Sequence, residues 1–186
     1  MVNARRGYTL TELLIAMAIG GILAAAALPA YRDLVKQQHA LATMTTLFGA
    51  LQLARQTATF ERATTTICPL QDTVCGSDWR NGFLVFIDRD RDGKLGPNER
   101  VLAQGEPVPS GAALTWKSFR GRSFLQFTSH GLTRAENGSF VYCASTDVPG
   151  GAMKIVINTA GRARYVVDNN HDGQFDDESG PVRCPR

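Results

Sequence analysis

Acidic side chains alternate along residues 88–99 in an order that calcium-binding loops use. The segment matches D-x-D-x-D-G-x5-E, in which alternating carboxylates and a final glutamate surround a calcium ion while the glycine makes a tight turn. The four candidate ligands are Asp88, Asp90, Asp92 and Glu99. The flanking residues have the composition of strands rather than helices, and Asp-Gly is also a common hairpin turn. We therefore favour a solvated β-turn, with a calcium site as the alternative.

Two arginines form a second group, in the run Gly161-Arg162-Ala163-Arg164. Side chains alternate along a strand, so both guanidinium groups would lie on one face, roughly 7 Å apart, and would suit successive phosphates of a nucleic acid. An acidic segment, residues 168–178, follows closely and opposes this charge; it begins like the calcium pattern but lacks the final glutamate, so we favour a turn there too. We expect Arg162 and Arg164 to make structural or subunit contacts, with DNA binding as the alternative.

Four cysteines are the remaining reactive groups, and an exported chain would form disulfides from them. Spacing alone permits three pairings. Six residues separate Cys68 from Cys75, a short loop that one bond could close, and Cys143 with Cys184 could hold the C-terminal segment against a strand. We favour these two pairs. A zinc site is not supported, because the chain has no Cys-x-x-Cys pair and no well-spaced histidine.

Enzymatic chemistry finds little support. The sequence has no Walker loop, no Gly-x-Ser-x-Gly motif and no paired histidines, since His39, His130 and His171 are isolated. We expect a protein that is not an enzyme and that has no cofactor, apart from the alternative calcium ion.

An uncharged apolar run lies near the N-terminus, ahead of all these groups. Residues 13–28 contain no charged side chain, and extension back to Tyr8 gives the roughly 20 residues that cross a bilayer but includes Glu12. An acidic residue at the end of such a run is costly, which makes Glu12 a candidate functional residue. The alternative is an ordinary signal peptide cleaved within the alanine-rich residues 24–27.

A long helix and a β-rich region follow. Apolar residues recur at helical spacing up to about Phe60, which predicts one helix from Tyr8 with an amphipathic second half. Its apolar stripe comprises Leu34, Leu41, Met44, Phe48, Leu51, Ala54 and Ala58. Eight short strands separated by turn residues are then predicted. They are residues 64–68, 83–88, 100–104, 113–117, 124–128, 139–144, 154–158 and 163–167.

The order of features at the N-terminus resembles that of type IV pilins and type II secretion pseudopilins. Basic residues precede Gly7, an aromatic residue follows it, and Glu12 and the apolar run lead to Pro29. The resemblance implies cleavage after Gly7 by prepilin peptidase and N-methylation of Tyr8. It also implies that Glu12 pairs with the N-terminal amine of a neighbouring subunit and that Pro29 kinks or melts the helix in the filament. A buried carboxylate is tolerable only if it meets such a partner.

The rest of the chain resembles the GspH/FimT branch of these proteins. The recurring pieces are residues 51–58, 78–90 and 161–164. The implied fold is α+β, with a long N-terminal helix packed on an antiparallel β-sheet head. The expected segments are a leader peptide (1–7), a transmembrane or filament-core helix (8–29), an amphipathic half-helix (30–60) and a head domain (61–186).

The function implied is that of a minor pilin of the FimU/FimT type. It would be anchored in the inner membrane with a periplasmic head, and would help prime pilus assembly in a tip complex with other minor pilins and the major pilin. Adhesion and twitching motility would follow. One alternative is a DNA-binding minor pilin for natural transformation, which is the function associated with the G-R-x-R motif in this branch. Another is a GspH-type pseudopilin of a type II secretion system.

Bulk charge does not favour a nucleic-acid or lipid partner. Of 20 basic side chains, Arg5 and Arg6 lie in the expected leader, which leaves 18 against 17 acidic residues. DNA binding would therefore have to rest on a local patch.

Overall fold

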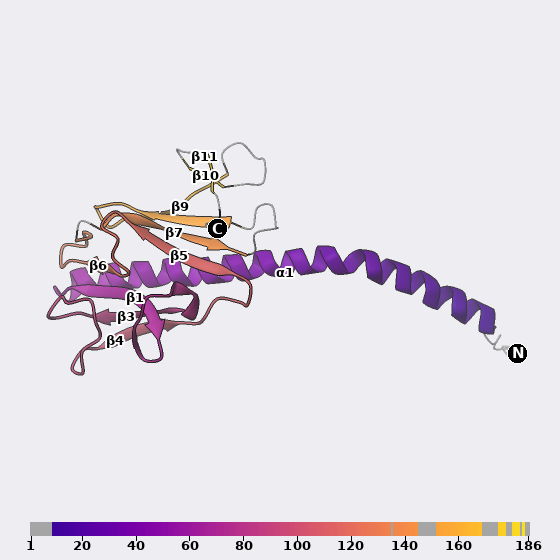
Figure 1. Ribbon diagram of the computed structural model, residues 1–186, viewed down its shortest axis with the longest axis horizontal. Helices are drawn as coiled ribbons and strands as arrows, with labels where there is room; N and C mark the ends of the chain where they lie inside the picture. Colours follow the sequence, from indigo (N-terminus) through magenta and orange to yellow (C-terminus); the bar gives the residue numbers. More distant parts are fainter. Residues whose placement is uncertain are drawn as a thin grey trace, which may run out of the picture. The chain divides into compact units, whose positions relative to one another are not determined.

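Helix α1 runs from Leu10 to Phe60 in the computed structural model (Figure 1). The structure describes residues 9–134, 136–144, 152–168, 175–177, 180–182 and 184. The expected leader, residues 1–7, and Tyr8 lie outside this range. The chain divides into two compact units, residues 1–36 and 37–186, and α1 contributes to both. The predicted helix end at Phe60 is confirmed, and the helix begins two residues later than predicted.

In the first unit, residues 9–34 are all exposed. Large apolar side chains such as Leu10, Met17 and Ile22 are each more than two thirds exposed. The helix continues through Pro29, which has no N–H to donate to the carbonyl of Ala25. Pro29 therefore weakens the helix at this point without ending it.

In the second unit, one stripe of α1 is buried. Its members are Ala40, Met44, Leu47, Ala50, Leu51, Ala54 and Ala58. Met44, Leu51, Ala54 and Ala58 were predicted, but Leu41 is 47% exposed, and Leu34, in the first unit, is 52% exposed, so both were wrong. Four of the seven buried residues are alanines, whose small side chains leave room for close packing, which periodicity alone does not reveal.

Two antiparallel sheets flank this part of α1, which confirms the expected fold of a long helix packed on an antiparallel β-sheet head (Figure 1). The first sheet has the order β2-β1-β3-β4, and β6 also pairs with β1. Thr65 of β1 donates from its hydroxyl to the carbonyl of Ala54, which joins this sheet to α1 (2.8 Å). The strands of this first sheet are β1 (Thr65–Gln71), β2 (Val74–Cys75), β3 (Phe83–Ile87), β4 (Val101–Gly105) and β6 (Leu125–Phe127). A short 3-10 helix, η1 (Trp79–Asn81), precedes β3.

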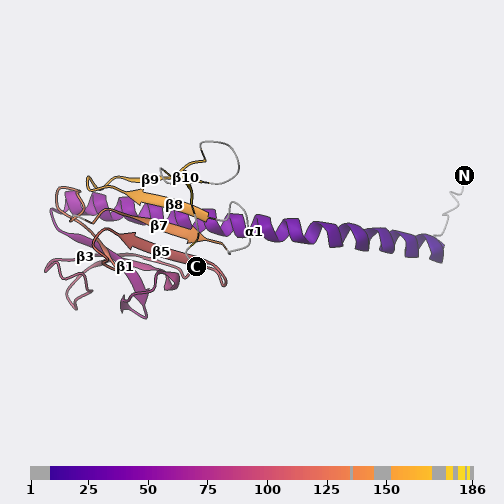
Figure 2. The ribbon, with the colours of Figure 1, turned by 45° about the horizontal axis from the view of Figure 1, so that its top comes forward.

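The second sheet has the order β5-β7-β8-β9, so β9 is an edge strand (Figure 2). The hydroxyl of Tyr165 on β9 donates to the carbonyl of Met44 (3.0 Å), and its ring stacks on Phe48 at 4.9 Å. The strands are β5 (Ala113–Ser118), β7 (Gly138–Cys143), β8 (Ala152–Ile157) and β9 (Ala163–Tyr165). A separate pair comprises β10 (Asp176–Asp177) and β11 (Gly180–Pro181). Every predicted strand overlaps an observed one; β2, β10 and β11 were not predicted.

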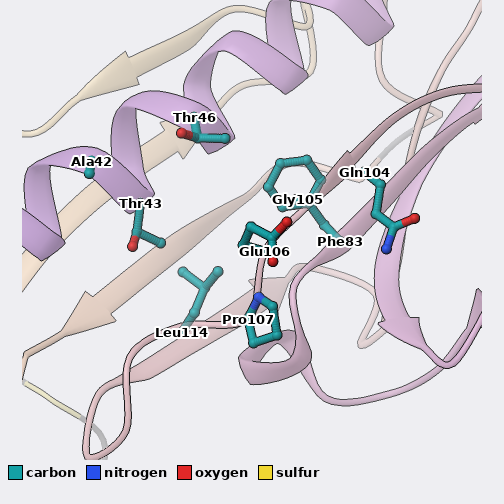
Figure 3. Close-up of a pocket in the computed structure, with 9 residues that line it drawn as sticks. All are labelled: Ala42, Thr43, Thr46, Phe83, Gln104, Gly105, Glu106, Pro107 and Leu114. Atoms are coloured by element: carbon teal, nitrogen blue, oxygen red, sulfur yellow. The ribbon is translucent and has the colours of Figure 1, made fainter.

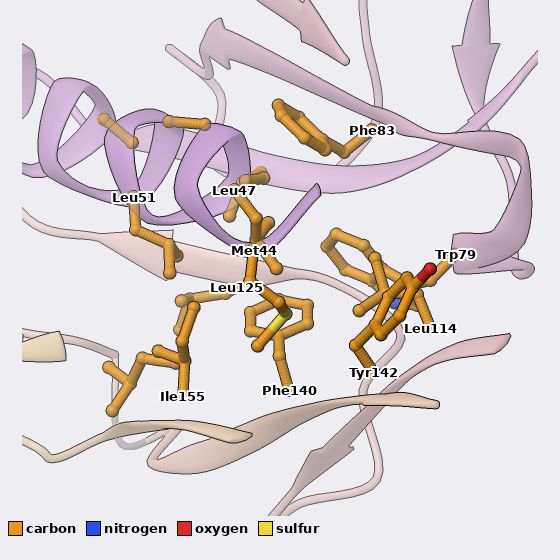
Figure 4. Packing of buried hydrophobic residues seen from close by; sticks show 14 of the residues in the cluster. Met44, Leu47, Leu51, Trp79, Phe83, Leu114, Leu125, Phe140, Tyr142 and Ile155 are labelled. Carbon is orange, nitrogen blue, oxygen red and sulfur yellow. The ribbon is translucent and has the colours of Figure 1, made fainter. Parts of the chain in front are cut away.

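The main core lies between α1 and the two sheets (Figure 4). Phe140 of β7 is fully buried at its centre, with Trp79 in edge contact at 4.7 Å and Trp116 tilted against it at 4.5 Å. All members of the buried clusters lie from Ala40 onward. The second unit therefore carries its own hydrophobic core.

Two disulfides join Cys68 to Cys75 and Cys143 to Cys184. These are the pairs favoured from the sequence. The first links β1 to β2, and the second holds Cys184 against the end of β7. No described cysteine is free.

Candidate functional site

Glu12 lies in the first turn of α1, where it forms a capping box with Thr9. The backbone N–H of Thr9 donates to Oε2 of Glu12 (3.0 Å), and the backbone N–H of Glu12 donates to the Thr9 hydroxyl (3.3 Å). Such reciprocal bonds satisfy N–H groups that a helix start leaves without partners. The signal T-x-x-E was present in the sequence, but sequence reasoning missed it. The carboxylate is exposed, so it remains available to a group outside the chain.

The helix that carries Glu12 is long and apolar enough to cross a membrane. Its most apolar window is not buried by any part of the chain. Gly7 and Tyr8, the expected cleavage and methylation residues, lie outside the described residues. The exposed apolar surface therefore requires an external environment, either lipid or other helices.

The acidic loop, residues 88–99, connects β3 to β4, and most of it is exposed, as expected of the solvated turn favoured from the sequence, but its first carboxylate is not. Asp88 is fully buried. Its Oδ2 accepts hydrogen bonds from the Thr66 hydroxyl (2.5 Å), the Gln126 amide (2.6 Å) and the backbone N–H of Gly93 (3.1 Å). The loop is thus anchored to β1 and β6 through one carboxylate.

Three of the four predicted metal ligands are brought together. Asp88, Asp90 and Glu99 each place one carboxylate oxygen within 4.8 Å of the others. Asp92 is not in this group; its side chain instead accepts a hydrogen bond from the backbone N–H of Lys94 (2.7 Å). The second acidic segment lies mostly outside the described residues.

Arg162 and Arg164 are both exposed at the edge strand β9, and they line a hollow with Val156, Asn158 and Ala163. Among the described residues, neither arginine has an ion-pair partner. Of the acids that we expected to oppose their charge, Asp168 is half-buried and has an interaction of its own. The side chains of the others, Asp172, Asp176, Asp177 and Glu178, are not among those that the structure describes.

The glycine of the same motif has a structural role. Gly161 has φ +72°, and a Cβ added there would lie 2.0 Å from the carbonyl oxygen of Gly131. Its N–H closes a turn onto the carbonyl of Asn158 (2.9 Å). Only glycine fits this conformation and this close approach.

Arg55 of α1 holds this turn in place, a role that sequence reasoning missed. Its Nε donates to the carbonyl of Gly131 (3.0 Å), and its Nη2 donates to the carbonyl of Ala160 (3.3 Å). Two of the recurring sequence pieces, residues 51–58 and 161–164, therefore meet in the folded head. Their spacing of more than 100 residues gave no signal of this contact.

A buried glutamate, Glu136, forms an ion pair with the partly exposed Arg122. Burial raises the pKa of Glu136 above its ordinary value of 4.5, whereas Arg122, with Nη1 2.7 Å from Oε1, lowers it. Because the pKa of Glu136 is raised in the folded state, the unfolded chain loses the Glu136 proton at a lower pH than the folded chain does. Ionisation of Glu136 therefore costs stability, and the cost grows as the pH rises from 4.5 through the raised pKa.

A pocket of about 220 Å³ lies between α1 and the β4–β5 connection (Figure 3). Glu106 is the charged residue among the nine that line it. Thr43, Thr46, Phe83 and Leu114 supply much of the wall. No histidine, cysteine or lysine is among the residues that line this pocket.

Comparisons with known proteins agree with this anatomy. The family model described as "Type II transport protein GspH" matches residues 43–161, and a model of the prokaryotic N-terminal methylation motif matches residues 2–28. The head of the chain and its N-terminus thus match separate models, as the sequence pieces had indicated.

The curated relatives match short segments of the chain. Fimbrial protein Q of Moraxella bovis is 55% identical over 38 residues, and a fimbrial protein of Moraxella nonliquefaciens is 62% identical over 34 residues. These alignments cover 20% and 18% of this chain and 24% and 22% of the relatives. The chain therefore matches about a quarter of the length of these relatives.

Two solved structures share the fold. The type IV minor pilin FimU of Pseudomonas aeruginosa is 22% identical, with a TM-score of 0.54, and the alignment covers 69% of this chain and 89% of the FimU chain. The minor pseudopilin EpsH of Vibrio cholerae is 11% identical, with a TM-score of 0.52, and the alignment covers 68% of this chain and 95% of the EpsH chain. Because the first family model covers more than half of the chain, the chain belongs to the GspH family.

Proposed function

We propose that this chain is a minor pilin of the FimU/FimT type, which helps to prime type IV pilus assembly in a tip complex with other minor pilins and the major pilin. In this proposal prepilin peptidase removes residues 1–7 and methylates Tyr8 in the inner membrane. The head then remains in the periplasm until the subunit joins the filament, where it supports adhesion and twitching motility. The role is structural rather than enzymatic.

The observation that supports assembly most directly is the exposed apolar helix with one carboxylate in its first turn. Apolar surface is stabilised by about 25 cal/mol per Å² when it leaves water, so side chains such as Leu10, Met17 and Ile22 favour burial against lipid or neighbouring helices. Glu12 would be costly in that setting unless it met a cation. The N-terminal amine of a neighbouring subunit is such a cation, and pairing with it would fix the relative height of two helices.

The test is replacement of Glu12 in the native host. Glu12→Gln keeps a group that suits the capping box but removes the charge, and Glu12→Ala removes both. We expect both variants to be cleaved normally but to be depleted in sheared pili by about 100-fold or more, since breaking a buried ion pair costs about 3–5 kcal/mol. Immunoblots of membranes and sheared pili, with mass spectrometry of the processed N-terminus, measure the two steps separately.

Asp33→Ala is the matched control, because Asp33 is an exposed acid of the same helix whose pairing with Lys36, at 3.8 Å, contributes little. It should enter pili normally. Normal incorporation of Glu12→Gln would contradict the proposed ion pair. A gene deletion that abolished protein secretion but left pili intact would instead assign the chain to a type II secretion pseudopilus as a GspH-type pseudopilin.

DNA binding during natural transformation is a second candidate function, supported by the exposed pair Arg162 and Arg164. Both lie at an edge strand, beside a hollow, without an ion-pair partner among the residues that the structure describes. Two guanidinium groups at alternate positions suit neighbouring phosphates. Affinity for duplex DNA should then fall steeply as salt is added.

The measurement is fluorescence anisotropy of labelled duplex DNA with the full chain in neutral detergent across a salt series. For Arg162→Ala/Arg164→Ala we expect the slope of log affinity against log salt to become shallower by about 2, because two phosphate contacts are lost. Arg89→Ala/Lys94→Ala removes two exposed charges from the acidic loop and should leave the slope unchanged. Equal loss in both double variants, or no binding at low salt, would reject DNA binding through the arginine pair.

A further inference from the structure

One oxygen of Asp88 has no hydrogen-bond partner among the residues that the structure describes, although Asp88 is fully buried. Oδ2 accepts from Thr66, Gln126 and Gly93, whereas no described donor reaches Oδ1. An ionised carboxylate can only accept, and an unpaired charged oxygen away from water is expensive. The side-chain oxygen of the neighbouring Gln126 is likewise buried and unpaired. Within the described part of the chain, these two buried oxygens therefore lack the donor or cation that they require.

The acidic loop supplies further oxygens at the same place. Carboxylate oxygens of Asp88, Asp90 and Glu99 lie within 4.8 Å of one another. A calcium ion binds oxygens at about 2.3–2.6 Å, so two of its ligands can lie up to about 5 Å apart. One ion between the three carboxylates would reach all of them. Since Oδ2 of Asp88 already serves three donors, Oδ1 is the oxygen left for the ion.

The loop backbone holds these carboxylates in position. Glu99 accepts hydrogen bonds from the N–H groups of Arg89 (2.7 Å) and Gly96 (2.9 Å), one on each oxygen. Asp90 accepts from the N–H of Asp92 (3.3 Å). Gly93 has φ +78°, and a Cβ there would collide with the ring of Phe124 at 2.4 Å, so the sharp turn needs glycine. The oxygens of Glu99 and the bonded oxygen of Asp90 each accept one of these hydrogen bonds and keep a second lone pair for a cation.

We propose that the acidic loop binds one calcium ion through Oδ1 of Asp88 and the carboxylates of Asp90 and Glu99, with water and backbone carbonyls completing the shell. The ligands are all hard oxygens, which suit calcium rather than zinc. Magnesium requires near-octahedral geometry at shorter distances and dehydrates reluctantly, so it fits the loop less well. The exposed cations Arg89, Arg91 and Lys94 weaken binding, which places the affinity in the range of about 0.1–1 mM that extracellular modules show.

Calcium bound there would join the β3–β4 connection to both β1 and β6, because Asp88 also contacts Thr66 and Gln126. The expected result is a more stable head at the calcium concentrations found outside the cytoplasm. This inference does not depend on whether the subunit serves a pilus, a pseudopilus or DNA uptake.

The experiment is calorimetric titration of CaCl₂ into the EDTA-treated and dialysed full chain in neutral detergent, together with thermal unfolding of the head. We expect one ion per chain and, at calcium about tenfold above its dissociation constant, a rise in Tm of about 3–6 °C. Asp90→Asn and Glu99→Gln should abolish this rise. Asp90 is exposed, so Asp90→Asn should retain nearly the wild-type Tm in EDTA.

Asp72→Asn is the matched control, since it makes the same chemical change at an exposed turn between β1 and β2. It should keep the full calcium response. The proposal is overturned if the wild-type chain shows no heat and no Tm shift up to about 10 mM calcium, well above the expected affinity range. It is also overturned if Asp90→Asn responds like the wild type or if magnesium gives an equal shift.

Discussion

Phe140→Ala is expected to destabilise the head by about 3–5 kcal/mol, the cost of removing a fully buried aromatic ring from a packed core. Phe140 has no exposed surface and contacts both Trp79 and Trp116, so the neighbouring rings cannot easily fill the space it leaves. Contacts between aromatic rings add to the loss. Chemical denaturation followed by tryptophan fluorescence measures the change directly, because both partners are tryptophans.

Phe119→Ala is the matched control, since Phe119 is 80% exposed at the end of β5. It should change the free energy of unfolding by less than about 0.5 kcal/mol. If Phe140→Ala lowered the free energy of unfolding no more than Phe119→Ala does, Phe140 would not be packed in the core as the structure shows.

Gly161→Ala is expected to cost about 2–5 kcal/mol, because two penalties add. A residue with a Cβ pays about 1–2 kcal/mol in the left-handed conformation. Its Cβ would also lie 2.0 Å from the carbonyl oxygen of Gly131, so the backbone must move at a further cost of about 1–3 kcal/mol. The same carbonyl accepts from Arg55, and that bond should loosen. Urea denaturation of the full chain in detergent measures the loss.

Gly111 provides the control, because it also has a positive φ, +84°, but has open space where a Cβ would point. Gly111→Ala should therefore show the conformational penalty alone, about 1–2 kcal/mol. Equal costs at the two glycines would mean that the turn at Gly161 is not tightly packed. The comparison also separates the glycine of the G-R-x-R motif, which builds the turn, from its arginines, which are exposed.

The sequence indicated most of the fold because the local signals were strong. Helical periodicity located the end of α1 at Phe60, and turn residues marked all eight predicted strands. It did not indicate that the strands form two sheets, because pairing depends on contacts between distant segments. The buried face of α1 was only partly predicted, since Ala40 and Ala50 face the core for reasons of close approach rather than hydrophobicity.

The candidate sites show a similar division. The spacing of Asp88, Asp90 and Glu99 could be read directly, but the burial of Asp88 could not, because Thr66 and Gln126 reach it from other strands. The hydrogen bonds of Arg55 to Gly131 and Ala160 could not be predicted for the same reason. The motifs indicated which residues matter, and the tertiary contacts decided how they act.

Directional hydrogen bonds fix helix α1 within the head, among them those from Thr65 to Ala54, from Tyr165 to Met44 and from Arg55 to Gly131. A slip of one residue would shift the helix by about 1.5 Å and rotate it by about 100°, which no hydrogen bond tolerates. Tension applied to the helix is therefore transmitted to both sheets as to a rigid body. Under load, the head should fail by unfolding as a whole rather than by sliding along its own helix.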